Sequence, residues 1–272
     1  MNFLRNRLFL CLLIVLLYMQ MVGSPDVYAK VVPSLCKIVH PSDSSIESEC
    51  RRLKRGETLE SLFGDRWVDV ARFNRIDRRH IYPGVHIKVP KKLDDIVNFT
   101  PMPKFYQPAE LDPKFILIDL SEQFLGAYEY GQLVFSAPIT SGEEDKETPA
   151  GQFAFSAFDS RHVSSLYYVE NTTKLYPIHY GLRFYINKLG VAFWIHGRDV
   201  PGFPGSHGCI GLYDEEMQKQ YYGYPGKPLL EDAKTLFEWV ITPLSDDGKY
   251  HNIKGPAVLI TGHAPALITR KH

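Results

Sequence analysis

The sequence predicts a mainly β protein, in which a β-sandwich or barrel-like domain with one or two helices follows a small βααβ module. From Lys114 onward, short apolar runs alternate with turn residues, which is typical of antiparallel strands. Residues 50–90 have the pattern of a strand, two short helices and a strand. The chain has 272 residues, 44% hydrophobic and 23% charged, which is enough for two modules that each bury a core.

Charge and cysteine content exclude some classes of protein. Lysine plus arginine and aspartate plus glutamate each number 31, so the net charge is zero. A nucleic-acid binder needs a basic face, and this balance argues against one. Four cysteines are too few for a small protein held together by disulfides.

Residues 1–29 have the pattern of a secretory signal peptide. Arg5 and Arg7 precede the apolar run 8–17, and Val27-Tyr28-Ala29 offers a cleavage site before Lys30. The run is shorter than the roughly 18 to 20 residues that span a bilayer. We therefore expect export to the periplasm or cell envelope, with no stable membrane span after cleavage. An uncleaved anchor is the alternative.

Three cysteines follow the predicted signal. Cys36 and Cys50 enclose a short polar segment and could form a disulfide in an oxidising compartment. Cys209 is then the odd one out. A lone thiol in such a compartment is either buried and inert or chemically used.

An N-terminal segment, 30–49, leads into the βααβ module at 50–90. Leu59, Leu62 and Phe63 share one helical face, and the alternating run 85–89 predicts a half-buried strand.

This module resembles the lysin motif, a small peptidoglycan-binding module. The resemblance rests on Gly56-Glu57-Thr58-Leu59, Asn74, Ile81-Tyr82-Pro83-Gly84 and Ile87-Lys88-Val89-Pro90. In that family the glycan lies beside the loops after the first strand and before the last one. The resemblance implies that the glycan-contacting residues are Gly56, Glu57, Thr58, Tyr82 and Gly84. The alternative is a module that only spaces or packs against its neighbour.

Residues 91–113 contain four prolines and predict a semi-rigid, extended linker. The larger domain then spans 114–263, and 264–272 form a tail. Helical patterns occupy 214–221 and 229–240. The predicted strands are 115–120, 124–130, 133–140, 151–158, 182–186, 191–195 and 258–260.

The chemistry is concentrated at 196–211, which holds His196, His207, Cys209 and five glycines. A thiol needs a base to react at neutral pH, and imidazole is suited to that role. Glycines let backbone amides approach an acyl group and hold an oxyanion. Two alternatives are a zinc site made by the two histidines and the cysteine, for which the His-x-Cys spacing is tight, and a structural loop.

Ser206-His207-Gly208-Cys209, with His196-Gly197 upstream, resembles the catalytic signature of the L,D-transpeptidases of bacterial cell walls. Ser141-Gly142 and Thr148-Pro149-Ala150-Gly151-Gln152-Phe153 also resemble stretches of that family, as does 118–123. The resemblance covers roughly 114–263. It implies a cysteine acyltransferase that cross-links peptidoglycan stem tetrapeptides through a thioester and uses no metal or other cofactor.

The resemblance assigns roles to individual positions. Cys209 matches the nucleophile and His196 the general base, which the carbonyl of Gly197 would orient. The amides of Gly208 and Cys209 would form the oxyanion hole. His207 and Ser206 would shape the site. Tyr180 and Trp194 are candidate substrate walls, with core packing as the alternative.

Two departures from the family pattern concern the substrate. The bridge between His196 and Ser206 is short, and Gly211 stands where the family usually has arginine or asparagine. Arg198 or Arg183 could supply the polar group that faces the substrate.

The sequence leaves the acyl acceptor open. The amine of a neighbouring stem peptide, an envelope lipoprotein, or water would each serve the same Cys-His pair. With water the protein would be an L,D-carboxypeptidase or endopeptidase. A non-catalytic protein that binds glycan strands is the third hypothesis.

Overall fold

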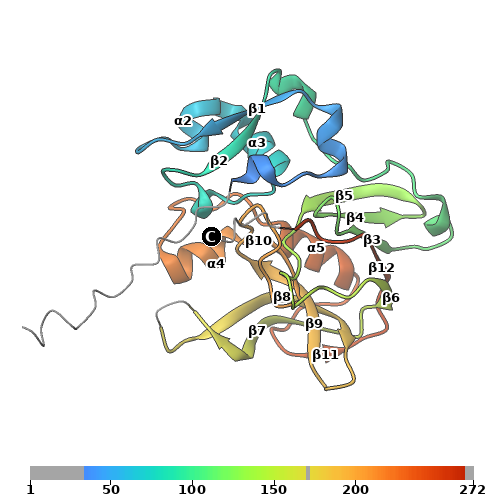
Figure 1. Ribbon diagram of the computed structural model, residues 1–272. Coiled ribbons are helices and arrows are strands. Elements are labelled where there is room, and N and C mark those ends of the chain that lie inside the picture. Colours follow the sequence, from blue (N-terminus) through green and yellow to red (C-terminus); the bar gives the residue numbers. More distant parts are fainter. Residues whose placement is uncertain (1–33, 170–171, 267–272) are drawn as a thin grey trace, which may run out of the picture. The chain divides into compact units, whose positions relative to one another are not determined.

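The computed structural model describes residues 34–169 and 172–266 (Figure 1). The predicted signal peptide at 1–29 and the end of the predicted tail, 267–272, lie outside the described residues. In the part that is described, no helix is long and apolar enough to cross a membrane.

Within the described residues, the larger domain contains two five-stranded sheets. The first has the order β5-β4-β3-β12-β6. Its strands are β3 (Phe115–Asp119), β4 (Phe124–Glu129), β5 (Gln132–Pro138), β6 (Gly151–Ala154) and β12 (Ala257–Thr261). The predicted antiparallel meander is confirmed, because β4 pairs antiparallel with both β3 and β5. The last strand, β12, lies between β3 and β6 and is parallel to β3.

The second sheet has the order β10-β9-β8-β7-β11. Its strands are β7 (Ala157–Tyr168), β8 (Leu175–Ile186), β9 (Ala192–Arg198), β10 (Ile210–Tyr213) and β11 (His251–Asn252). The single strand expected at 151–158 is wrong, since the chain passes from the first sheet to the second at the buried Phe155. The sequence pattern also missed most of the long β7–β8 hairpin, whose outer half is largely exposed and does not alternate between buried and exposed residues.

One apolar core joins the two sheets. It contains Ile118 and Leu125 from the first sheet and Leu182 and Ile195 from the second. The expected helices are present as α4 (Glu215–Tyr222) and α5 (Asp232–Ile241). Helix α5 adds apolar side chains, among them Phe237, to the same core. The prediction of a mainly β, sandwich-like domain with one or two helices is therefore confirmed.

The N-terminal module has the predicted βααβ order. Strand β1 (Ser48–Arg52) pairs antiparallel with β2 (His86–Pro90), and α2 (Leu59–Phe63) and α3 (Trp67–Asn74) lie between them in sequence. Helix α2 begins after Thr58, whose side chain accepts a hydrogen bond from the amide of Ser61 at 3.1 Å. Such caps satisfy amide groups that have no partner inside the helix.

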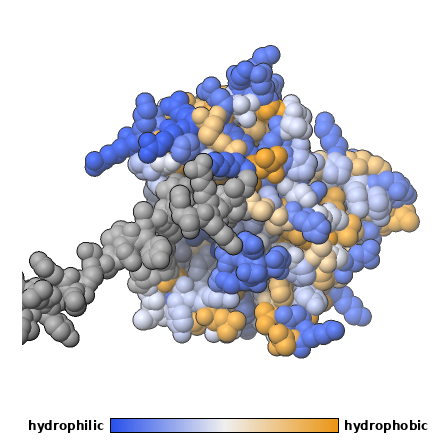
Figure 2. All heavy atoms as spheres, viewed as in Figure 1, coloured by the Kyte–Doolittle hydropathy of each residue, from blue (hydrophilic) through white to orange (hydrophobic). Residues whose placement is uncertain are grey.

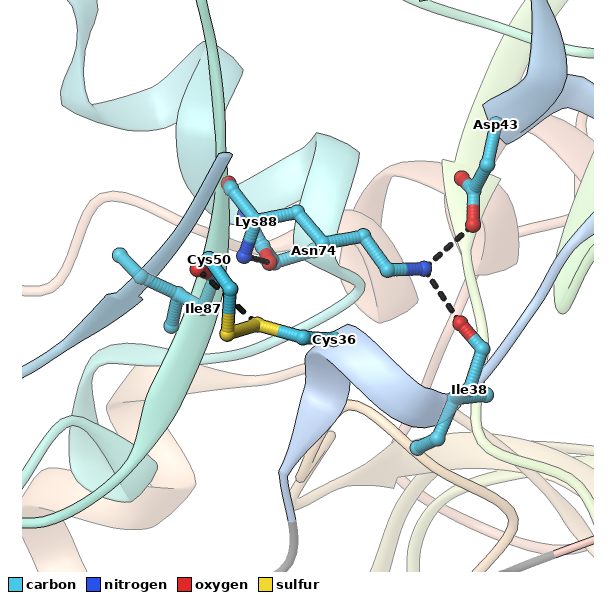
Figure 3. The surroundings of a disulfide bond; sticks show 7 residues. All are labelled: Cys36, Ile38, Asp43, Cys50, Asn74, Ile87 and Lys88. Carbon is cyan, nitrogen blue, oxygen red and sulfur yellow. Dashed lines mark hydrogen bonds and ion pairs between the residues drawn. A yellow bond between two sulfur atoms is a disulfide. The ribbon is translucent and has the colours of Figure 1, made fainter. Parts of the chain in front are cut away.

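Cys36 and Cys50 form a disulfide, which settles the pairing that the sequence left open (Figure 3). It ties the segment before β1 to β1 itself. Beside it, the ammonium group of Lys88 donates to the carbonyl of Ile38 and to the carboxylate of Asp43. The disulfide is consistent with an oxidising, extracytoplasmic location.

The expected extended linker at 91–113 is wrong. This segment forms two short 3-10 turns, η5 (Leu93–Ile96) and η6 (Gln107–Ala109), and packs against the domains on either side. Ile96 and Ala109 are fully buried. The ring of Phe99 lies edge-on to Phe73 of α3 at 5.2 Å and to Phe124 of β4 at 5.8 Å. The apolar side chains between the prolines bind the segment to the core.

Buried ion pairs and hydrogen bonds also join the N-terminal module to the larger domain. Arg75, which follows α3, is 1% exposed and donates from Nε to the carbonyl of Glu122 at 3.1 Å. Arg78 donates from Nε to Glu215 at 2.7 Å, where the carboxylate is fully buried. The module and the larger domain belong to one compact unit.

Candidate active site

The site is built on the adjacent strands β9 and β10, which run parallel. Ile210 pairs with Ile195, and Gly211 pairs with His196. Paired residues project to the same face of a sheet, and successive residues alternate between faces. Ile195 and Ile210 point into the core between the sheets. The opposite face therefore presents His196 and Gly211, and Cys209 lies in the bend that leads directly into β10.

His196 is 3% exposed, and its Nδ1 atom lies 2.8 Å from the carbonyl oxygen of Gly197. A carbonyl only accepts, so Nδ1 carries the hydrogen and Nε2 keeps its lone pair. Burial, with the positive charge of Arg198 as the second cause, lowers the pKa of His196 to about 3. Any side chain at 197 would collide with the carboxylate of Asp214, which explains the glycine.

Cys209 is a free, half-buried thiol. Burial raises the pKa of this thiol, and the amide of Trp194 and the charge of Arg198 offset only part of the effect. Burial disfavours the charged form of both side chains, so the pKa shifts favour a neutral thiol at Cys209 and a neutral imidazole at His196.

Ser206 organises the turn before Cys209. Its hydroxyl accepts from the amide of Gly208 at 3.0 Å and donates to the carbonyl of Cys209 at 2.5 Å. The Gly208 amide therefore donates to Ser206 in this structure, and it can serve the expected oxyanion hole only if that hydrogen bond breaks. Gly208 has φ +108, and a Cβ there would lie 2.5 Å from the ring of Phe193, so glycine is required.

Sequence reasoning did not assign a role to Thr148. Its buried hydroxyl donates to the carbonyl of Gly208 at 2.9 Å and accepts from the amide of Gly142 at 2.9 Å. Thr148 thus ties the turn that carries Cys209 to the strand-end loop after β5. The Thr-Pro-x-Gly stretch was the signal that could have identified it.

His207 is exposed and lies beside the β7–β8 hairpin. Its Nε2 is 3.4 Å from a carboxylate oxygen of Glu143, and its ring centroid is 4.4 Å from that of Tyr167. Burial and the charge of Lys146 lower its pKa. These contacts place His207 at the rim of the site.

Arg198 reaches the same face as Cys209. Its aliphatic stem occupies the volume that a side chain at position 211 would need. Its Nη2 donates to the carbonyl of Gly205 at 3.2 Å, while its buried Nε has no hydrogen-bond partner within the described residues. Arg183, the other candidate, instead donates from Nε to Ser156 at 3.0 Å.

The two candidate substrate walls have packing roles. Trp194 is 4% exposed and stacks against His162 with centroids 4.6 Å apart. Tyr180 packs on the core beside Phe237, with centroids 5.8 Å apart, and burial raises its pKa to about 12.

The zinc alternative finds no support in the geometry. Across 34–169 and 172–266, three residues whose potential ligand atoms all lie within 4.8 Å of one another occur at Asp77, His80 and Asp199. These groups are engaged with one another and with nitrogen donors. Asp77 Oδ1 lies 2.7 Å from Nδ1 of His80, and Asp199 Oδ2 lies 3.2 Å from Nη1 of Arg79.

The predicted glycan-contacting residues gather at one end of the β1–β2 pair. The amide of Gly84 donates to the carbonyl of Leu53 at 2.9 Å, which joins the two loops that contain them. Gly56 and Tyr82 are exposed, whereas Glu57 is half-buried and pairs with Arg51 at 2.9 Å.

A family model, the YkuD L,D-transpeptidase catalytic domain, matches residues 113–249, half of the chain. The chain belongs to this family. The match contains β9, β10 and every catalytic residue that the sequence predicted, and the N-terminal module lies outside it. No curated protein sequence matches the chain.

Solved structures similar to the chain include several L,D-transpeptidases. An enzyme from Enterococcus faecium is 23% identical, with 54% of this chain and 49% of that chain covered and a TM-score of 0.34. L,D-transpeptidase 1 of Mycobacterium tuberculosis is 19% identical, with 55% and 62% covered and a TM-score of 0.35. A protein from Stackebrandtia nassauensis is 18% identical, with 75% and 69% covered and a TM-score of 0.38. The chain spans about half the length of the first of these, and the membership of the YkuD family rests on the family model.

Proposed function

We propose that this YkuD-family protein is a peptidoglycan L,D-transpeptidase that works through a thioester on Cys209. The observation that supports this most is the register of β9 and β10. In this register His196 pairs with Gly211, which is two residues after Cys209. The free Nε2 of His196 is the atom that can take the thiol proton.

The reaction starts from the neutral pair. As Cys209 sulfur attacks the carbonyl carbon on the L-centre of the third stem residue, its proton passes to Nε2 of His196. The tetrahedral intermediate then breaks its C–N bond, and His196 returns the proton to the departing amine of D-alanine. An amine of a neighbouring stem attacks the thioester and restores the thiol. No step requires the thiol to be ionised before it attacks, so the raised pKa of Cys209 is compatible with this reaction.

The oxyanion of the intermediate needs hydrogen-bond donors. Because Ser206 holds the amide of Gly208, we assign the amide of Cys209 as the donor from this turn. Gly197 keeps the imidazole in the tautomer that the reaction needs.

Arg198 is the residue we assign to substrate recognition. A stem tetrapeptide ends in a carboxylate, and guanidinium groups pair with carboxylates in a directional, often two-pronged way. The Nε of Arg198 is buried without a partner in the described part of the chain, and the group lies on the face that carries Cys209.

Incubation with a disaccharide-tetrapeptide, followed by intact-protein and product mass spectrometry, tests the function. We expect a thioester adduct and cross-linked dimers, and both should be absent from Cys209→Ala. Shortened monomers without dimers would identify a carboxypeptidase instead. Failure of the wild type to form an adduct with either the stem peptide or a carbapenem would support the non-catalytic hypothesis.

We further propose that the N-terminal module is a lysin-motif module that binds glycan strands through Gly56, Glu57, Thr58, Tyr82 and Gly84. The two loops are joined at Leu53 and Gly84, and hydrophilic side chains gather over α2 and β1 (Figure 2). Tyr82 offers a partly exposed ring for stacking on a sugar. Tyr82→Ala should weaken co-sedimentation with insoluble peptidoglycan. Tyr130→Ala, an exposed tyrosine on the larger domain, is the control and should not weaken it.

A further inference from the structure

The segment between His196 and Cys209 leaves the larger domain and packs against the N-terminal module. Val200 is fully buried in the apolar cluster of the N-terminal module, together with Ile76, and Phe203 packs against this cluster. Gly202, at φ +93, lies so close to Leu35 that a Cβ would be 2.7 Å from the leucine methyl groups. The N-terminal module therefore supports this loop by direct packing contacts.

Asp77 fixes the loop by two reciprocal hydrogen bonds. Its amide donates to the carbonyl of Val200 at 2.8 Å, and its Oδ2 accepts from the amide of Val200 at 2.7 Å. An antiparallel bridge between Ile76 and Pro201 continues this pairing. The backbone of the loop is thus held at Val200 and Pro201 by Ile76 and Asp77 of the N-terminal module.

The Asp77 carboxylate is itself held on every side. Oδ2 also accepts from Nε2 of Gln218, a residue of α4, at 2.7 Å, and Oδ1 accepts from the amide of His80 at 3.0 Å. The same Gln218 amide group donates to Asp199 at 2.9 Å. Burial alone would raise the pKa of Asp77, but the charge and hydrogen bonds of His80 hold it below its usual value.

A segment containing two prolines and four glycines between a base and a nucleophile would, if unsupported, sample many conformations. Catalysis requires the two reacting side chains to stay close to one geometry, and small displacements cost large factors in rate. We propose that Asp77 is a positioning residue of the active site, which makes the N-terminal module a structural part of the catalytic apparatus as well as a candidate glycan binder. This inference rests on the proposed function only where it predicts an effect of Asp77 on turnover.

The test compares two aspartates in the full chain. Asp77→Asn removes the charged acceptor that holds Val200. Asp232→Asn is the matched control, because Asp232 is also buried and also joins the two parts of the chain, through Arg72 at 2.5 Å, without contacting the loop. We expect Asp77→Asn to lower kcat at least tenfold with KM within twofold, and to speed amide hydrogen exchange in 199–205. Asp232→Asn should change kcat by less than twofold at a similar loss of stability.

The rate of Cys209 carbamidomethylation by iodoacetamide is the second readout, because it needs no substrate. We expect it to change at least threefold in Asp77→Asn and to stay within 1.5-fold in Asp232→Asn. Equal alkylation rates and equal loop exchange in the two variants would overturn the positioning role, whatever the turnover. If the wild type makes no product, the proposed function fails, and the alkylation and exchange data still decide this inference.

Discussion

The Nδ1 atom of His196 lies 2.8 Å from the carbonyl oxygen of Gly197, its own neighbour in β9. This one contact decides which ring nitrogen is free to act as a base. Burial, as the largest cause, lowers the pKa of this imidazole to about 3. Such a base is neutral throughout the physiological range, and it needs to hold a proton only while the thioester forms and breaks.

The first prediction concerns the resting thiol. Because burial raises the pKa of Cys209, its alkylation by iodoacetamide should be slower at pH 7 than that of free cysteine and should still rise above pH 9. The charge of Arg198 lowers this pKa, so Arg198→Gln should move the alkylation profile to higher pH. A plateau already reached at pH 7 would contradict the neutral resting pair. Arg55→Gln, an exposed residue of the N-terminal module, controls for net charge.

The second prediction concerns the space shared by Arg198 and Gly211. Arg198→Ala should raise KM for a tetrapeptide by roughly 10- to 100-fold, as expected for losing a charged hydrogen bond of about 1.5–3 kcal/mol. Gly211→Ala should also impair binding, because the new methyl group displaces the arginine stem. The double variant Arg198→Ala/Gly211→Arg, which returns a guanidinium to the same space, should recover part of the loss. A double variant no better than either single one would count against the assignment.

The third prediction is loss of stability in acid. His40 and His196 are both buried, and the pKa of each is lowered to about 3, with burial as the largest cause. The unfolded chain, with histidine pKa values near 6.5, binds more protons than the folded chain between those limits. The unfolding free energy is therefore highest above pH 6.5, and it decreases as the pH falls below that value. From pH 7 to 5 each histidine should cost about 2 kcal/mol of unfolding free energy.

Urea unfolding at pH 7 and pH 5 measures this loss. His196→Gln should reduce the loss of unfolding free energy between pH 7 and pH 5 by the contribution of one histidine. An unchanged difference would show that His196 is protonated or exposed in the folded protein.

The fourth prediction concerns the buried pair of Arg75 and Glu122. Arg75→Met leaves Glu122 and Asp43 without their shared cation and should lower the unfolding free energy by roughly 3–5 kcal/mol. Lys91→Met removes a lysine that pairs with Glu47 at the surface, where both side chains are more than half exposed, and should change stability by less than about 1 kcal/mol. Similar effects of the two substitutions would contradict the buried position of Arg75.

Local chemistry by itself determined much of this protein. The short apolar runs separated by turn residues from Phe115 to Ile139 were enough to predict the meander, because each strand pairs with the next and the turns between them are short. The residue types at 196–209 were enough to predict thiol chemistry, because few other combinations supply a nucleophile, a base and flexible amides together.

Tertiary structure decided what depends on long-range contacts. Whether the thiol of Cys209 is charged depends on how deeply it is buried, and a four-residue sequence motif does not contain that information. Whether Gly208 has a free amide depends on the rotamer of Ser206. The 91–113 segment became part of the core because Phe99 meets aromatic rings on both sides, from α3 and β4. The role of Asp77 follows from its pairing with Val200, far away in sequence, and only the folded chain brings those two residues together.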